Sequence, residues 1–104
     1  MTYQERQILN ERNLEAKKTS LRVQSRQLDY LVHIADDFSF RAKVFLKEQN
    51  QSVLALTKQE TSATLLKRLS ELAETAVKLS SDCNGLSTLK LREADGLTLA
   101  NFEK

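Results

Sequence analysis

The sequence predicts an all-α fold: a long antiparallel helical hairpin, or coiled-coil-like bundle, formed as a single helical domain by residues 1–104. Three observations lead to this prediction. The chain contains no proline and only two glycines, the residues that break or weaken helix interiors. It is rich in leucine, glutamate, lysine, arginine, glutamine and alanine, which favour helices. Its apolar residues recur at the three- and four-residue steps of a helix face.

The first helix is expected over about residues 3–48. Thr2 and Glu5 have the spacing of a capping box, in which each side chain bonds a free backbone N–H at the helix start. An apolar residue then recurs every seven residues, which defines heptad row a, and a second row, d, follows three residues further along. Both rows are expected to face inward. Row a consists of Leu14, Leu21, Leu28, Ala35 and Ala42, and row d of Leu31, Phe38 and Phe45.

The chain is expected to reverse within residues 48–58 and to form a second helix over about residues 53–84. Thr57 and Glu60 repeat the capping-box spacing. No glycine or proline marks the turn, so one continuous helix is the alternative. Two helices with matching apolar rows and a short connection form an antiparallel hairpin. The inward residues expected on the second helix are Leu65, Leu69, Leu72, Ala76, Leu79, Cys83 and Leu86, with Leu66 and Ala73 widening that face.

The segment 86–104 changes character. Gly85 is predicted to end the second helix, because glycine readily adopts the left-handed conformation that follows a helix. Leucines then alternate with other residues on either side of Asp95 and Gly96, which favours a short β-hairpin. Two strands alone are marginal in water, so this hairpin would pack on the helices or on another chain. An irregular tail and a third short helix ending at Gly96 are the alternatives.

Residues 28–45, LDYLVHIADDFSFRAKVF, carry a further row on the other side of the first helix. A helix with apolar residues on two sides is normally buried on two sides, whereas a two-helix hairpin covers only one. We therefore predict a non-enzymatic protein–protein interaction module: an adaptor, chaperone or assembly subunit that packs its helices against another protein or a second copy of itself, as a hetero-assembly or homodimer. The expected partner-binding residues are Val23, Tyr30, His33, Phe40 and Val44.

A basic edge of the first helix offers an alternative function. Lys18, Arg22 and Arg26 follow one another at four-residue steps, a pattern that could bind phosphates. The chain as a whole is nearly balanced, with 16 basic against 14 acidic residues. No base-stacking aromatic residue is interleaved with the stripe. A nucleic-acid-associated helical protein is thus the second hypothesis.

Enzymatic chemistry has little support. His33 and Asp37, four residues apart, form the one candidate for an acid–base or metal site, and this spacing is more typical of a local ion pair. Cys83 falls on an inward row, where cysteine acts as a small hydrophobe. No phosphate-loop or hydrolase motif occurs. We predict no catalytic residue, metal ligand or cofactor.

The sequence also bears on location. The N-terminal residues MTYQERQ lack the apolar core of a secretory signal. No apolar run reaches the roughly 20 residues that a membrane-spanning helix requires. A cytoplasmic protein without a membrane span is expected.

Overall fold

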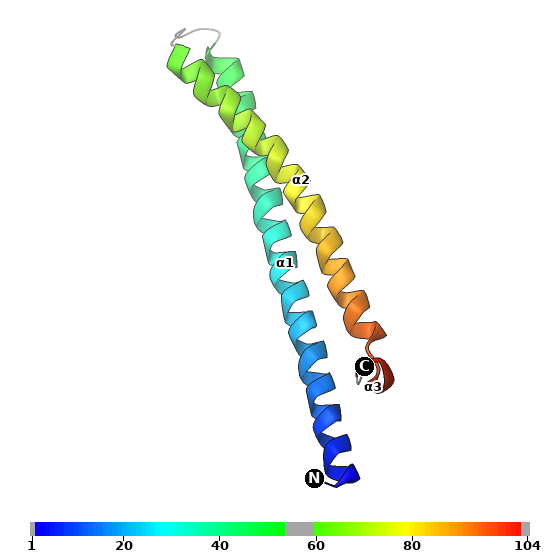
Figure 1. Ribbon diagram of the computed structural model, residues 1–104. Coiled ribbons are helices and arrows are strands. Elements are labelled where there is room, and N and C mark those ends of the chain that lie inside the picture. Colours follow the sequence, from blue (N-terminus) through cyan, green and yellow to red (C-terminus); the bar gives the residue numbers. More distant parts are fainter. Residues whose placement is uncertain (1, 54–59, 103–104) are drawn as a thin grey trace. The chain divides into compact units, whose positions relative to one another are not determined.

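The computed structural model is an all-α helical hairpin, as the sequence predicts (Figure 1). It describes residues 2–53 and 60–102, and the side chains of residues 2–49 and 63–102. The long helices α1 (Tyr3–Val53) and α2 (Glu60–Gly96) pack against each other, and a short helix α3 (Leu99–Phe102) follows. No strand occurs within the described ranges, and no helix there is long and apolar enough to cross a membrane.

The contacts divide the chain into two compact units. Unit 1 comprises Met1–Asp29 and Asn84–Lys104, and unit 2 comprises Tyr30–Cys83. Each unit therefore contains one part of α1 and one part of α2, and α3 belongs to unit 1.

The first helix begins where the sequence predicts. The backbone N–H of Thr2 donates to the Glu5 carboxylate at 3.3 Å, and the N–H of Glu5 donates to the Thr2 hydroxyl oxygen at 3.1 Å. This reciprocal capping box satisfies N–H groups that have no partner within the helix. At its other end α1 continues to Val53, past the predicted end near residue 48. The remainder of the predicted turn, including Thr57 of the second capping box, lies outside the described residues.

The predicted helix stop at Gly85 is wrong, and so is the β-hairpin after it. Helix α2 continues to Gly96. Gly85 does not adopt a left-handed φ, and a helix tolerates one glycine at a cost of about 1 kcal/mol. Beyond it, Ser87 and Ala94 are buried at the seven-residue spacing of a helix face, which compensates for the glycine. The alternation of leucines near Gly96 is coincidental, because Leu89 and Leu91 are exposed residues of a helix.

A second reciprocal cap links α2 to α3. The backbone N–H of Thr98 donates to the Asn101 side-chain oxygen at 2.8 Å, and the N–H of Asn101 donates to the Thr98 hydroxyl at 3.4 Å. The Asn101 side-chain amide also donates to the carbonyl oxygen of Gly96 at 2.9 Å. One asparagine thus satisfies backbone groups at the start of α3 and at the end of α2.

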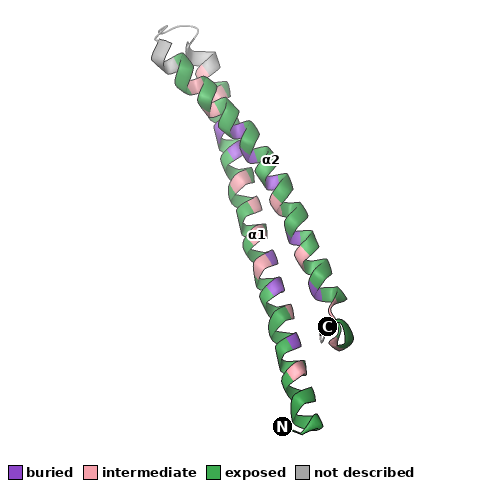
Figure 2. Cartoon of the chain, in the orientation of Figure 1, coloured by how far each residue is buried: buried purple, intermediate pink, exposed green. Residues whose placement is uncertain are grey.

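Small side chains fill the contact between α1 and α2 in unit 2. Alanine and serine at such positions let two helix backbones approach closely, toward the lower end of the roughly 8–10 Å range of helix packing distances. Each of these residues removes little apolar surface from water. Among the described side chains of unit 2, the buried ones are Ser39, Ala42, Ala73, Ala76 and Ser80, and Figure 2 shows such buried positions recurring along both helices.

Unit 1 has a larger buried core. Leu14 and Leu21 are buried on α1, and Leu21 is only 1% exposed. Ser25 is buried beside them, and Ser87 and Ala94 are buried on α2. No buried side-chain nitrogen or oxygen among the described residues lacks a hydrogen-bond partner.

The prediction that row a faces inward agrees with the structure, whereas the inward orientation of row d is wrong. In place of row d, each helix pairs row a with row e, which lies four residues after row a. Row e of α2 contains Ala73, Ser80, Ser87 and Ala94, and these small residues let the helices approach more closely than large ones would. The large row-d residues are left exposed: Leu31, Phe38 and Phe45 on α1, and Leu65, Leu72, Leu79 and Leu86 on α2.

Candidate interaction surface

A row of large apolar side chains in unit 2 lies outside its small-residue seam. Six large row-d side chains remain between 42% and 56% exposed, although each is leucine or phenylalanine. We call this set the outer apolar face. It consists of Leu31, Phe38 and Phe45 from α1, and Leu65, Leu72 and Leu79 from α2.

Helix geometry places both halves of the outer apolar face on one side of unit 2. When two antiparallel helices are viewed along their common axis, the heptad positions follow one another clockwise on one helix and anticlockwise on the other. In an antiparallel pair that packs rows a and e on both helices, row d therefore emerges on the same side of each. Leucine and phenylalanine from α1 thus lie beside leucine from α2 in one strip.

The partner-binding residues expected from the sequence lie on another side of α1. Tyr30 is 67% exposed and Phe40 is 69% exposed, and Val23, His33 and Val44 are exposed as well. Except for Val23, these residues belong to unit 2. We call Tyr30, His33, Phe40 and Val44 the second face of α1. Their own chain leaves these side chains accessible.

A charged pair borders the second face. The Arg41 guanidinium lies 2.9 Å from the Asp37 carboxylate, one helical turn away. Both side chains are largely exposed, so the pair adds only about 0.3–0.5 kcal/mol to stability. Together with Phe40 and Val44 they line a shallow hollow that lies on α1 alone. Asp37 thus pairs with Arg41, and not with His33 as the four-residue spacing suggested.

The structure brings no chemical centre together around His33 or Cys83. Within the described residues, no three histidine, cysteine, aspartate or glutamate side chains are placed to hold a metal ion. His33 is exposed. Cys83 is half-buried with a free thiol.

The basic stripe is only partly exposed. Arg22 and Arg26 point to solvent, whereas Lys18 is half-buried, because it falls on row e beside the seam of unit 1. The half-buried Lys18 therefore contributes less than the two arginines to an exposed phosphate-binding edge.

A polar cluster in the seam of unit 1 was not predicted from the sequence. The Ser87 hydroxyl donates to the Asp29 carboxylate at 2.6 Å and lies 2.7 Å from the Ser25 hydroxyl oxygen. Ser87 has one hydroxyl proton, so Ser25 is the donor in the bond between the two serines. The Ser25 carbonyl oxygen is a further acceptor, 3.2 Å from the Ser87 hydroxyl. This cluster joins α1 to α2 and contains no basic group that could activate a serine.

The sequence signal for this cluster was present but small. Ala73, Ser80, Ser87 and Ala94 recur every seven residues along α2. Such a row does not stand out in the sequence, because alanine and serine are common at any surface position.

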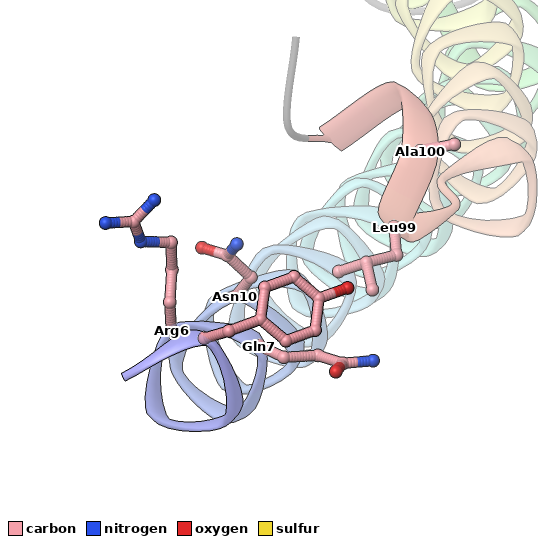
Figure 3. A pocket seen from close by; sticks show the side chains of 6 residues that line it. Arg6, Gln7, Asn10, Leu99 and Ala100 are labelled. Carbon is pink, nitrogen blue, oxygen red and sulfur yellow. The ribbon is translucent and has the colours of Figure 1, made fainter. Parts of the chain in front are cut away.

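An open hollow lies between the start of α1 and α3 in unit 1. It has a volume of about 550 Å³ and is lined by Tyr3, Arg6, Gln7, Asn10, Leu99 and Ala100. Arg6 and Leu99 border opposite sides of it (Figure 3). All the α1 residues except Asn10 are exposed, so the hollow has no buried polar group to orient a ligand.

The chain matches no protein-family model, and comparisons with curated proteins and with solved structures likewise give no match. The exposed surfaces of the chain are therefore the features that bear on its function.

Proposed function

We propose that this chain is a non-enzymatic protein–protein interaction module, an adaptor, chaperone or assembly subunit that acts by packing its helices against other helices. One observation carries the proposal: large apolar side chains remain exposed on two sides of α1. Tyr30 and Phe40 represent the second face, and Phe38 represents the outer apolar face. On protein surfaces in water, contiguous apolar patches larger than a few hundred Å² typically mark interaction sites.

The mechanism is the docking of a helix by its apolar anchors. A partner helix or groove would cover Tyr30, Phe40 and Val44, and burial of apolar surface stabilises such a complex by about 25 cal/mol for each Å². Tyrosine and phenylalanine supply large contact areas with few rotatable bonds, which limits the entropy lost on binding. The charges of Asp37 and Arg41 at the border would favour partners of complementary charge.

The nucleic-acid alternative has weaker support. Phosphate binding draws on several exposed cations, since each neutralised phosphate adds to affinity. Here Lys18 is half-buried, and Arg22 and Arg26 are exposed on a chain with a formal net charge of only +2. The large apolar side chains exposed on two sides of α1 are the more distinctive feature of the described surface.

Phe40→Asp tests the proposal. The full chain would be produced in its native cells, and the proteins held in its complexes would be quantified for the unaltered chain and the variant. We expect at least a tenfold loss of bound protein, because an anchor is removed and a charge is placed in an apolar contact. Circular dichroism should show unchanged helicity, since Phe40 is 69% exposed.

Ser81→Asp is the matched control. Ser81 is an exposed neutral residue of α2, away from both apolar faces, and it receives the same new charge. It should leave the complexes unchanged. If the chain forms no complex at all, with itself or with another protein, or if Ser81→Asp is as disruptive as Phe40→Asp, the proposed function is wrong.

A further inference from the structure

In unit 2, row d carries large apolar residues although the contact between the two helices does not use that row. In a lone pair, each helix contacts one neighbour, and here the contact uses rows a and e. In a four-helix bundle each helix has two neighbours, so rows a and d point to the common core while rows e and g face the two adjacent helices. Row a of α2 contains Leu69 and Ala76, and row d contains Leu65, Leu72 and Leu79. Such rows suit the core of a four-helix bundle.

We propose that the outer apolar face is a dimerisation surface, covered by the same face of a second copy of this chain to give a four-helix bundle. This inference rests on the proposed function and names the partner for one of its two apolar faces. A second copy supplies two more antiparallel helices with identical seven-residue spacing. Its leucine and phenylalanine rows therefore match those of the first copy along the whole face.

The charges beside the face are compatible with self-pairing. Row g borders the outer apolar face on the side away from the seam. It carries Arg41 and Glu48 on α1, and Arg68 and Asp82 on α2, all exposed. Because each helix contributes one cation and one anion, a two-fold related copy can place unlike charges opposite each other. A border of one sign would have repelled its own copy.

Among the described side chains of unit 2, residues 30–49 and 63–83, the fully buried ones are alanine and serine. The larger seam residues Val32, Leu46, Leu66 and Leu69 are half-buried. Covering six leucine and phenylalanine side chains would supply the apolar burial that small residues cannot. Folding and dimerisation of unit 2 should therefore be coupled.

The test is sedimentation equilibrium of the full chain from low micromolar to several hundred micromolar. We expect a mass of twice 11.9 kDa and a thermal midpoint that rises with protein concentration. Both measurements use the unaltered chain, so they do not depend on the folding of any variant. A monomeric mass across the whole range would overturn the proposal.

Leu72→Glu, compared with Val77→Glu, locates the surface. Both residues are exposed and apolar, and both lie on α2 in unit 2, but Val77 faces away from the outer apolar face. Leu72→Glu should raise the dimer dissociation constant by about 100-fold, on the order of tenfold for each substituted copy. Val77→Glu should leave it within about twofold. Equal effects from the two variants would overturn the proposed surface.

Failure of this inference differs from failure of the proposed function. A chain that is monomeric at every concentration, yet retains another protein in a way that depends on Phe40, overturns the dimer alone. A dimer that Leu72→Glu separates, with Phe40→Asp having no effect on any complex, supports the dimer and removes the role of the second face.

Discussion

The seam of unit 2 and its outer apolar face use opposite kinds of side chain. The seam buries alanine and serine, of which Ala73 is 1% exposed, whereas the neighbouring Leu72 is 55% exposed. In most helical pairs the larger apolar residue would be the buried one. The difference indicates that contact within the chain depends on close backbone approach, and that the large side chains are available for contacts outside the chain.

The seam and the outer apolar face should contribute to stability in different ways. A seam of small residues is sensitive to added volume, because there is no space into which a larger side chain can turn. The outer apolar face is sensitive to lost area or added charge only when something covers it. Substitutions on the two surfaces should therefore differ in their dependence on protein concentration.

The largest effect is expected from added volume in the seam. Ala73→Leu should lower the free energy of unfolding by about 1–3 kcal/mol, because overpacking forces the helices apart. Urea unfolding at fixed protein concentration measures it. Ala63→Leu is the control, since Ala63 is an exposed residue of the same helix. If both variants change stability equally, the seam is not tightly packed and the comparison fails.

Removal of one hydroxyl from the polar cluster should have the next largest effect. Ser87→Ala leaves Ser25 and Asp29 without their partner and should cost about 1–2 kcal/mol in urea unfolding. Ser25→Ala combined with Ser87→Ala should cost less than the sum of the single changes, because the buried hydroxyls are then both absent. Strict additivity in this double-mutant cycle would show that the two serines do not interact.

A smaller effect, of opposite sign, is expected at Gly85. Gly85→Ala should raise the free energy of unfolding by about 0.5–1 kcal/mol, since alanine favours the helix and restricts the unfolded chain. The structure has open space where the new methyl group would lie, and no left-handed φ. A loss of stability measured by the same urea method would contradict the continuous helix through this position.

The smallest effect is expected at the exposed ion pair. Arg41→Gln removes the contact with Asp37 and should change unfolding stability by less than about 0.5 kcal/mol, because solvent screens exposed charges. The difference should shrink further in high salt. A change above 1 kcal/mol would mean that Arg41 makes a stronger contact than this exposed pair, such as one across an interface.

The sequence was sufficient for the helices and row a, but not for the choice between rows d and e. Rows d and e both follow row a at the same seven-residue period, so periodicity alone does not rank them. The usual preference for burying leucine placed Leu72 inward together with Ala73, whereas the structure buries Ala73 and leaves Leu72 exposed. That preference gave way to close approach of two backbones, which a pattern of large residues does not register.

The C-terminal segment illustrates a second reason for error. Leu89 and Leu91 suggested a strand because large residues alternated, while the residues that continue the helix face, Ser87 and Ala94, are small. The cap formed by Asn101 was missed because asparagine takes the place usually held by glutamate or glutamine in a capping box. For the candidate interaction surfaces, the exposure of Tyr30 and Phe40 followed from the heptad geometry, whereas periodicity does not encode the identity of a partner.

The hydroxyl cluster of unit 1 has a consequence for register. On the α2 side of this seam, row e presents only small buried residues such as Ser87 and Ala94, which by themselves offer little resistance to one helix sliding past the other by a heptad. Such a slip of α2 would place Ala94 opposite Ser25 in place of Ser87, and the carboxylate of Asp29 would lose its hydroxyl donor. A polar group at a single buried position is a known means of fixing helix alignment. The hydrogen bonds among Ser25, Ser87 and Asp29 thus favour one register of the two helices over others that the small side chains would allow.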